Sequence, residues 1–303
     1  MTTERKIRSL STSQTLFGYL FIFPAILGIL LFVAGPMIYS LYLSFTDWNI
    51  LSPAQWVGFG NYHRIFAEDE LFYKSLQVTF YYAILTIVCT LAISFIVALL
   101  LNVNMRGQSL FRVIFYLPSI VPVIAGSVLW VWLYDTDFGL LNYLLGEIGI
   151  SKQLWINGEG SAIPALTLAS MWGTGNVILI FLAGLQDVPK HLHEAVEIDG
   201  GNGWHKLKSV TIPLMSPTIF FNFLMGFVGA FTGFTQSYAM TNGGPNYATL
   251  MYVFNIYREG FRNQSMGYAC ALAWVLFIIM VILTYLIFKT SKGWVHYEGE
   301  GDR

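Results

Sequence analysis

Charged side chains are scarce in this sequence: 16 of its 303 residues are Lys or Arg and 17 are Asp or Glu, 11% in all. A soluble domain carries about 25% charged residues, because its surface must be solvated. The net charge of −1 also provides no basic surface for a nucleic acid. These shortages exclude an ordinary soluble domain and a nucleic-acid-binding protein.

Other chemical groups are missing as well. The two cysteines, Cys89 and Cys270, lie inside apolar runs, which predicts buried hydrophobic residues rather than a disulfide framework. No Gly-Lys dipeptide occurs, so the chain has no Walker A loop for a nucleotide phosphate. The loop histidines 191, 193 and 205 lack carboxylates or thiols at ligand spacing, so no metal site is expected.

Long apolar runs, in contrast, are abundant: apolar residues make up 55% of the sequence. Six stretches are long enough to cross a bilayer as helices, near 17–43, 76–102, 110–133, 162–186, 217–240 and 267–288. None has a charged residue in its middle, which argues against a proton-coupled carrier. The first stretch is too long for a cleavable signal peptide. The pattern predicts an all-α integral membrane protein with six transmembrane helices.

Basic residues indicate the orientation, since cytoplasmic segments are enriched in Lys and Arg. If the N-terminus is inside, eleven basic residues are cytoplasmic and five are outside. The cytoplasmic ones are Arg5, Lys6, Arg8, Arg106, Arg112, Lys190, Lys206, Lys208, Lys289, Lys292 and Arg303, and the outer ones are Arg64, Lys74, Lys152, Arg258 and Arg262. We therefore expect a cytoplasmic segment 1–16, a six-span domain 17–290 and a cytoplasmic tail 291–303.

The cytoplasmic segment 189–217, between the fourth and fifth stretches, begins with a helical pattern. Pro189 suits the first turn of a helix, where its missing N–H costs nothing. Leu192, Ala195 and Val196 recur at helical spacing, and a Gly-Gly pair at 200–201 supplies the stop. A first short helix is therefore predicted to end before these glycines.

A second short helix is predicted directly afterwards. Asn202 can cap it, and Trp204 and Leu207 give it an apolar side. Pro213 and Pro217 are expected to break the chain before the fifth span. Apolar residues in a loop that faces water usually mark a docking surface; the alternative is a helix pair that rests on the membrane.

The residues of this segment form a known pattern. They are Glu194-Ala195-Val196-x-x-Asp199-Gly200-Gly201, followed by Trp204, Leu207, Val210, Ile212-Pro213 and Pro217. The pattern resembles the EAA loop in permease subunits of bacterial ABC importers, above all the maltose and glycerol-3-phosphate type of carbohydrate permease. Two positions depart from it: Val196 and Gly201 stand where alanine is usual.

The resemblance extends over nearly the whole chain. Further matching segments are Trp56–Tyr62, Leu117-Pro118, Asp137–Asn142, Met240–Pro245 and Ala248-Thr249. The Thr-Asn-Gly-Gly-Pro stretch at 241–245 is similar to the subunit encoded first in a permease pair. The resemblance implies a type I ABC importer permease fold in a bacterial inner membrane.

The same resemblance implies which partners the chain has. The EAA loop forms coupling helices that sit in a cleft of an ATPase subunit, and the corresponding residues here are Glu194, Ala195, Asp199, Gly200, Trp204 and Leu207. The expected partners are a second homologous permease, two ATP-binding cassette ATPase subunits, an extracytoplasmic sugar-binding protein that faces the outer loop 241–266, and membrane lipid. ATP and Mg would be bound by the ATPase, so this chain is expected to hold no cofactor and not to be an enzyme.

Sugar-contacting positions are also implied by resemblance. The family's positions match Trp172, Gly173 and Asn176 in the fourth span and Phe231, Thr232, Gly233 and Gln236 in the fifth. Amide and hydroxyl groups hydrogen-bond to sugar hydroxyls, and aromatic rings cover the apolar face of a pyranose. Small and polar residues also pack helices together in membranes, so this structural role is the alternative for each position.

Three rival functions stay open at this point. An ABC permease for another solute, such as phosphate, amino acids or peptides, differs only through the carbohydrate-type motifs. An ion-coupled secondary carrier would respond to ionophores rather than to ATP depletion. An intramembrane enzyme would need reactive polar groups within the spans, and the sequence shows none there.

Overall fold

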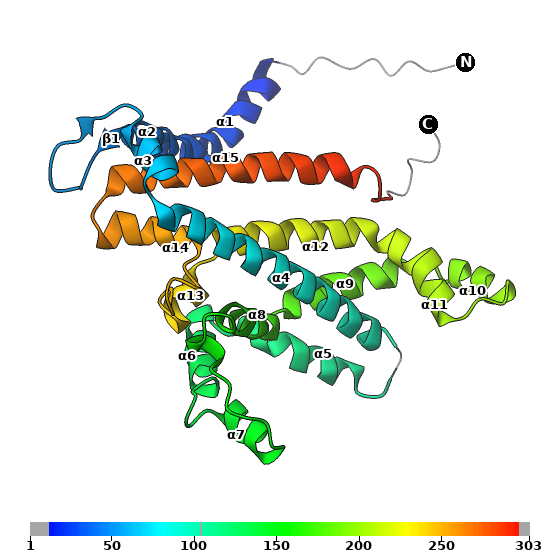
Figure 1. The fold of residues 1–303 in the computed structure, drawn as a ribbon. Helices are drawn as coiled ribbons and strands as arrows, with labels where there is room; N and C mark the ends of the chain where they lie inside the picture. Colours follow the sequence, from blue (N-terminus) through cyan, green and yellow to red (C-terminus); the bar gives the residue numbers. More distant parts are fainter. Residues whose placement is uncertain (1–11, 104, 297–303) are drawn as a thin grey trace.

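The computed structural model describes residues 12–103 and 105–296, and this part of the chain is almost entirely helical (Figure 1). The α-helices are α1 (Thr12–Ile29), α2 (Gly35–Ser44), α3 (Gly60–Ala67), α4 (Glu70–Leu101), α5 (Gln108–Tyr116), α6 (Val123–Leu133), α7 (Leu140–Glu147), α8 (Ala162–Trp172), α9 (Gly175–Asp187), α10 (Lys190–Ile198), α11 (Gly203–Lys206), α12 (Ile212–Thr232), α13 (Thr235–Met240), α14 (Tyr252–Tyr257) and α15 (Met266–Ser291). π-Helical turns are η1 (Leu30–Ala34), η4 (Leu207–Thr211) and η5 (Arg258–Arg262), and 3₁₀ turns are η2 (Leu117–Ile120) and η3 (Trp155–Asn157). Strands β1 (Thr46–Asp47) and β2 (Gln55–Trp56) pair antiparallel. Of the expected terminal segments, 1–11 and 297–303 lie outside the described residues.

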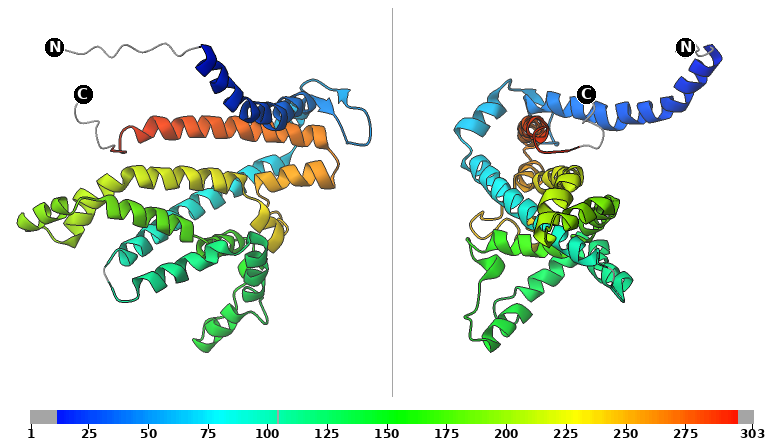
Figure 2. Two further views of the ribbon diagram at one scale, coloured as in Figure 1. Left: turned by 180° about the vertical axis from the view of Figure 1, so that it is seen from behind. Right: turned by 90° about the vertical axis from the view of Figure 1, so that its right-hand side faces the viewer.

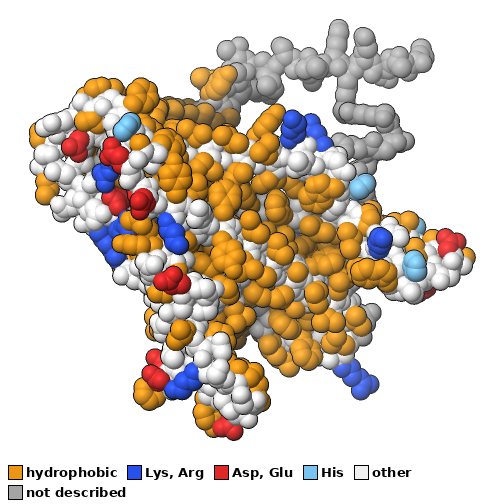
Figure 3. Space-filling view, in the orientation of Figure 1, with side chains coloured by type: hydrophobic (Ala, Val, Ile, Leu, Met, Phe, Trp, Pro, Cys, Tyr) orange, Lys and Arg blue, Asp and Glu red, His pale blue; other side chains and the backbone are white. Residues whose placement is uncertain are grey.

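The predicted six-span fold class is confirmed. Four unbroken helical stretches and two bent helix pairs in the described residues are long and apolar enough to cross a membrane, six spans if each pair counts once. The unbroken stretches are Leu16–Ser44, Glu70–Leu101, Gly203–Thr232 and Met266–Ser291. Hydrophobic side chains cover the middle of the molecular face in Figure 3, whereas most charged side chains lie toward its ends.

The first span is one continuous helix formed by α1, η1 and α2. In the most apolar 18-residue segment of this helix, no residue is buried within the structure described. Figure 2 shows α1 extending away from the other helices, while α2 packs on α15. A helix that is apolar on all sides and packs against little protein is one that lipid must cover.

The third and fourth spans are broken, which corrects the prediction of two continuous helices at 110–133 and 162–186. In the third, the helical stretches 108–120 and 123–133 meet at 98°. Val121 is extended before Pro122, as proline requires of the preceding residue. In the fourth, α8 and α9 meet at 57°, with the break at Gly173 and Thr174.

The fifth span begins earlier than predicted and ends earlier as well. A helical stretch runs unbroken from Gly203 to Thr232, so the expected chain break at Pro213 and Pro217 was wrong. Pro217 has no N–H for the carbonyl of Pro213, and the Ser216 hydroxyl donates to that carbonyl instead, at 2.6 Å. Serine side chains commonly satisfy backbone groups freed by proline in membrane helices. The predicted continuation to 240 is a separate helix, α13.

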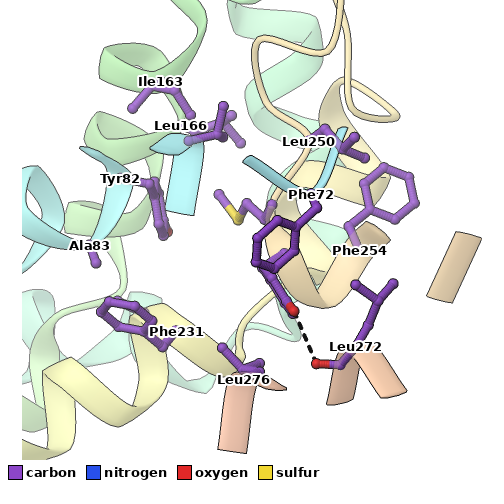
Figure 4. Packing of buried hydrophobic residues seen from close by; sticks show 14 of the residues in the cluster. Phe72, Tyr82, Ala83, Ile163, Leu166, Phe231, Leu250, Phe254, Leu272 and Leu276 are labelled. Carbon is purple, nitrogen blue, oxygen red and sulfur yellow. Dashed lines mark hydrogen bonds between the residues drawn. The ribbon is translucent and has the colours of Figure 1, made fainter. Parts of the chain in front are cut away.

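The segment 241–266, expected as an outer loop, is largely a packed element. Leu250, Met251 and Tyr252 are almost fully buried, and α14 packs between α4 and α15. The Tyr252 N–H donates to the Thr79 hydroxyl in α4 at 2.8 Å. The Tyr252 hydroxyl donates to the Leu272 carbonyl in α15 at 3.0 Å, the dashed line that ends at Leu272 in Figure 4. This cluster, which also contains Phe72, joins the ends of α4, α14 and α15.

α4 is the central helix of the fold: it packs against α8, α9, α12 and α14. At one end of the molecule, α10 and α11 project beyond the other helices, and α15 ends toward this same side (Figure 1). The strands, α3 and α14 lie at the opposite end. After α15 the chain turns back onto α12, where the His296 N–H donates to the Ser216 hydroxyl at 2.9 Å.

Candidate coupling surface and substrate pocket

The end of α10 is determined by glycine. Gly200 has φ +78°, a left-handed conformation that glycine adopts without the steric cost of a side chain. The Gly201 N–H donates to the Val196 carbonyl at 2.8 Å, and the Gly200 N–H donates to the Glu197 carbonyl at 3.0 Å. This is a Schellman motif, and it turns the chain sharply into α11, as the sequence predicts.

Asn202 begins α11, as predicted. Its side-chain oxygen accepts from the backbone N–H groups of Trp204 and His205 at 3.0 and 3.1 Å. The His205 ring nitrogen in turn accepts from the Asn202 N–H at 3.4 Å, which completes a capping box. α11 continues through η4 into α12, so it forms one unbroken helical stretch with the fifth span.

Two large apolar side chains of this helix pair are exposed. Ile198 is 86% exposed and Trp204 is 65% exposed. Glu194, Ala195 and Asp199 are exposed beside them, whereas Leu192, Val196 and Leu207 are half-buried. We define the coupling surface as Glu194, Ala195, Ile198, Asp199, Gly200 and Trp204. Ile198 was missed by the sequence reasoning, although it lies one turn after Glu194.

The two departures from the EAA pattern compensate each other in the structure. A Cβ atom at Gly201 would lie 2.5 Å from Val196 Cγ1 and 2.9 Å from the Val196 carbonyl oxygen. The larger side chain at 196 therefore occupies space that an alanine at 201 would need. Valine at one position and glycine at the other fit together.

We expect Gly201→Ala to destabilise the turn between α10 and α11 by about 1–3 kcal/mol, the usual cost of overpacking. Val196→Ala should restore part of this loss in the double variant, because it removes the closer contact but leaves the carbonyl. Amide hydrogen exchange of α10 measures the change. Equal protection in Gly201→Ala and the unaltered protein would contradict the packing account.

An ion pair joins the two helices through Glu197 and Lys206. The hydrogen bond from Lys206, together with its charge, holds the pKa of the Glu197 carboxyl below its ordinary value. Because folding lowers the pKa of Glu197, the ion pair stabilises the folded state fully at any pH above the ordinary glutamate pKa. This stabilisation is lost only as the pH falls through the lowered pKa. The Glu197 carboxyl is therefore charged throughout the neutral range.

Lys206→Gln should change transport by less than about twofold, because an ion pair with an exposed carboxylate contributes little. Transport is measured as sugar uptake into liposomes. At both pH 6 and pH 8, the difference between the variant and the unaltered protein should be equally small. A tenfold loss in Lys206→Gln would instead indicate that Lys206 itself contacts another protein.

Three of the seven predicted substrate residues meet in one pocket of about 250 Å³ between α6, α8 and α13. Trp172 and Gly173 come from the break of the fourth span, and Gln236 comes from α13. The Gln236 side-chain oxygen lies 2.7 Å from the Ser170 hydroxyl and 3.3 Å from that of Tyr82. These hydrogen bonds link α4, α8 and α13.

A second pocket of about 230 Å³ adjoins the first, since Ser170 and Gly173 line both. It continues between α4, α9 and α12 and is lined by further hydroxyl and amide side chains, Thr86, Thr90 and Asn222. Tyr82, Ser170 and these residues were missed by the sequence reasoning. The only feature of the sequence that could have pointed to them is that they are polar residues within apolar spans.

The other four predicted substrate residues line neither pocket. Phe231 is 3% exposed and packs edge-on against Phe80. Thr232 is exposed, and its hydroxyl donates to the Val228 carbonyl at 2.8 Å. Gly233 and Asn176 are exposed outside the pockets. The structure therefore does not bring these four together with Trp172 and Gln236, and their contact with substrate stays a prediction.

Comparison with known proteins identifies the family. The family of binding-protein-dependent transport system inner membrane components matches residues 90–295. The probable ABC transporter permease protein YesP of Bacillus subtilis is 38% identical over 99% of this chain and 97% of its own length. The trehalose/maltose transport system permease protein MalF of Thermococcus litoralis is 30% identical over 91% of this chain and 93% of its own.

A solved structure has the same fold. A chain in the crystal structure of a bacterial ABC transporter involved in the import of the acidic polysaccharide alginate superposes with a TM-score of 0.81 at 20% identity. The match covers 92% of this chain and 96% of that one. The chain is a membrane permease rather than an enzyme, and it belongs to the binding-protein-dependent transport system inner membrane components, the permease subunits of ABC importers.

Proposed function

We propose that this permease forms half of the translocation path for a sugar or oligosaccharide. The observation that carries the proposal is the pocket that Trp172, 38% exposed, and Gln236 line together. An aromatic face and an amide are the groups that bind a pyranose ring. The relative named for trehalose and maltose transport supports a carbohydrate.

A separate ATPase supplies the energy in this proposal. The sequence has no Gly-Lys dipeptide, so two ATPase subunits bind ATP and Mg, and the coupling surface receives one of them. ATPase closure moves α10 and α11, and the unbroken stretch from Gly203 to Thr232 carries the movement into the membrane. The helices then switch as rigid bodies between inward- and outward-facing states.

The remaining partners occupy opposite ends of the molecule. Both termini and the coupling surface face the cytoplasm, in agreement with the excess of basic residues in those segments. An extracytoplasmic binding protein delivers the sugar at the end that carries α3, α14 and η5. A second homologous permease completes the path, and lipid covers the exposed apolar helices.

The proposal is tested by purification of the tagged chain with its genomic neighbours in mild detergent. We expect a second six-span permease and two copies of an ATPase to co-purify, and sugar-loaded binding protein to stimulate ATP hydrolysis in liposomes. A chain that purifies alone despite expression of the ATPase would contradict the coupling role. Stimulation only by a phosphate, amino acid or peptide would contradict the carbohydrate assignment.

A further inference from the structure

Two hydroxyl groups converge on the side-chain amide of Gln236. The Ser170 hydroxyl donates to the Gln236 side-chain oxygen at 2.7 Å. The Tyr82 hydroxyl lies 2.8 Å from the Ser170 oxygen and 3.3 Å from the Gln236 oxygen. The three side chains come from α4, α8 and α13, so only the folded protein brings them together. We call these three residues the Tyr82–Ser170–Gln236 network.

The network lies where the two pockets meet. Ser170 lines both pockets, Tyr82 lines the one between α4, α9 and α12, and Gln236 lines the one between α6, α8 and α13. Gln236 is half-buried, and only its oxygen is hydrogen-bonded to protein in the part of the chain that the structure describes. Its amide nitrogen is not one of the buried polar atoms that lack a partner, so it has accessible surface. An accessible N–H donor of this kind can bind an oxygen of a sugar.

A glutamine side chain binds a ligand better when it is already held in place. Glutamine has several rotatable bonds, and ordering such a side chain as the ligand binds costs free energy. Hydrogen bonds from neighbouring residues lock the rotamer beforehand. Because the Ser170 hydroxyl occupies the Gln236 oxygen, the NH₂ group is the end of the amide that remains for a substrate.

We propose that Ser170 and Tyr82 are positioning residues for the transported sugar. Ser170 holds the Gln236 amide oxygen and Tyr82 holds Ser170, so that the Gln236 NH₂ group is directed toward an oxygen of the sugar. This inference rests on the proposed carbohydrate function and adds two residues that do not touch the sugar themselves. It differs from a purely structural role, in which the hydroxyls only join α4 to α8.

A second hydroxyl pair allows these two roles to be separated. Thr86 of α4 and Thr167 of α8 join the same two helices, with their hydroxyl oxygens 3.2 Å apart. Thr167 is 3% exposed and lines neither pocket. Valine has nearly the shape of threonine, so Thr167→Val removes a hydroxyl link between α4 and α8 without touching Gln236. It is the matched control for Ser170→Ala.

The assembled importer in liposomes, with saturating binding protein, is supplied with radiolabelled di- and trisaccharides, and the variants are compared on the sugar that the unaltered importer takes up fastest. Ser170→Ala should lower uptake by about twofold to tenfold, the range for one lost hydrogen bond, whereas Thr167→Val should not. Tyr82→Phe, which keeps the ring, should cause a smaller loss of the same kind. In a Gln236→Ala background, Ser170→Ala should cause no further loss, because no amide is left to hold.

Three results would overturn the positioning role and leave the carbohydrate function intact. One is a double variant of Ser170→Ala and Gln236→Ala in which the two losses multiply. Another is an equal loss of uptake in Ser170→Ala and Thr167→Val, which would indicate that the hydroxyls only join the helices. The third is unchanged uptake in both Ser170→Ala and Tyr82→Phe. If the unaltered importer took up no carbohydrate at all, the proposed function and this inference would both be wrong.

Discussion

Replacing Gly200 with valine is expected to lower substrate-stimulated ATP hydrolysis by the importer about fivefold to thirtyfold, since a left-handed conformation costs a non-glycine residue about 1–2 kcal/mol. Gly200 has φ +78° at the turn between α10 and α11. No atom lies within 4 Å of the position of an added Cβ, so the effect comes from the backbone conformation and not from a clash. A changed turn displaces Trp204 relative to Ile198 and divides the coupling surface.

The matched control is Gly200→Asn, because asparagine tolerates the left-handed conformation far better than a β-branched residue. Membrane insertion and co-purification with the second permease should be the same in both variants. ATPase activity and uptake in liposomes should separate them, with asparagine close to the unaltered protein. Full coupling in the valine variant would show that the turn does not position the docking residues.

Glu194→Lys tests the same surface through charge. Glu194 is exposed on α10, so lysine fits without altering the helix, and insertion should be unaffected. Its reversed charge should weaken docking to the ATPase and lower transport, because juxtaposed charges govern partner choice. Unchanged transport in both Glu194→Lys and Gly200→Val would contradict the coupling role.

The helix pair α10 and α11 was predictable from sequence because its determinants are local. The stop at Gly200 and the cap at Asn202 each act within one helical turn, and the structure shows both. The path of the fifth span was not predictable from its prolines. Whether Pro217 breaks a helix depends on whether another group satisfies the freed carbonyl, and here Ser216 does so.

The pocket was predictable only in part because its residues come from distant segments. Tyr82, Ser170 and Gln236 are linked across 88 and 66 positions of the chain. Hydropathy predicts that their helices cross the membrane, but it does not reveal which side chains meet. The bend of 98° between η2 and α6 places Trp130 beside Trp172, and Pro122 alone does not predict such an angle.

The break of the fourth span leads to the second prediction, which concerns two glycines only two positions apart. A Cβ at Gly175 would lie 2.8 Å from the Phe115 carbonyl oxygen and 2.8 Å from Tyr116 Cα. Both are backbone atoms and cannot move alone, so α9 must separate from the end of α5. Gly175→Val should therefore destabilise the protein by about 1–3 kcal/mol or more, since membrane helices that approach this closely depend on small residues.

Gly173→Val should leave stability unchanged but impair transport. The nearest atom to an added Cβ is the Ser170 carbonyl oxygen at 3.7 Å, an ordinary contact, and Gly173 lines both pockets, so a larger side chain there should narrow the substrate path. Thermal unfolding in detergent should match the unaltered protein, while sugar uptake should be largely lost. Gly175→Val should instead lower the unfolding temperature and the yield of assembled complex. If both variants unfolded normally and transported normally, neither the packing of α9 on α5 nor the position of the substrate path would be as the structure indicates.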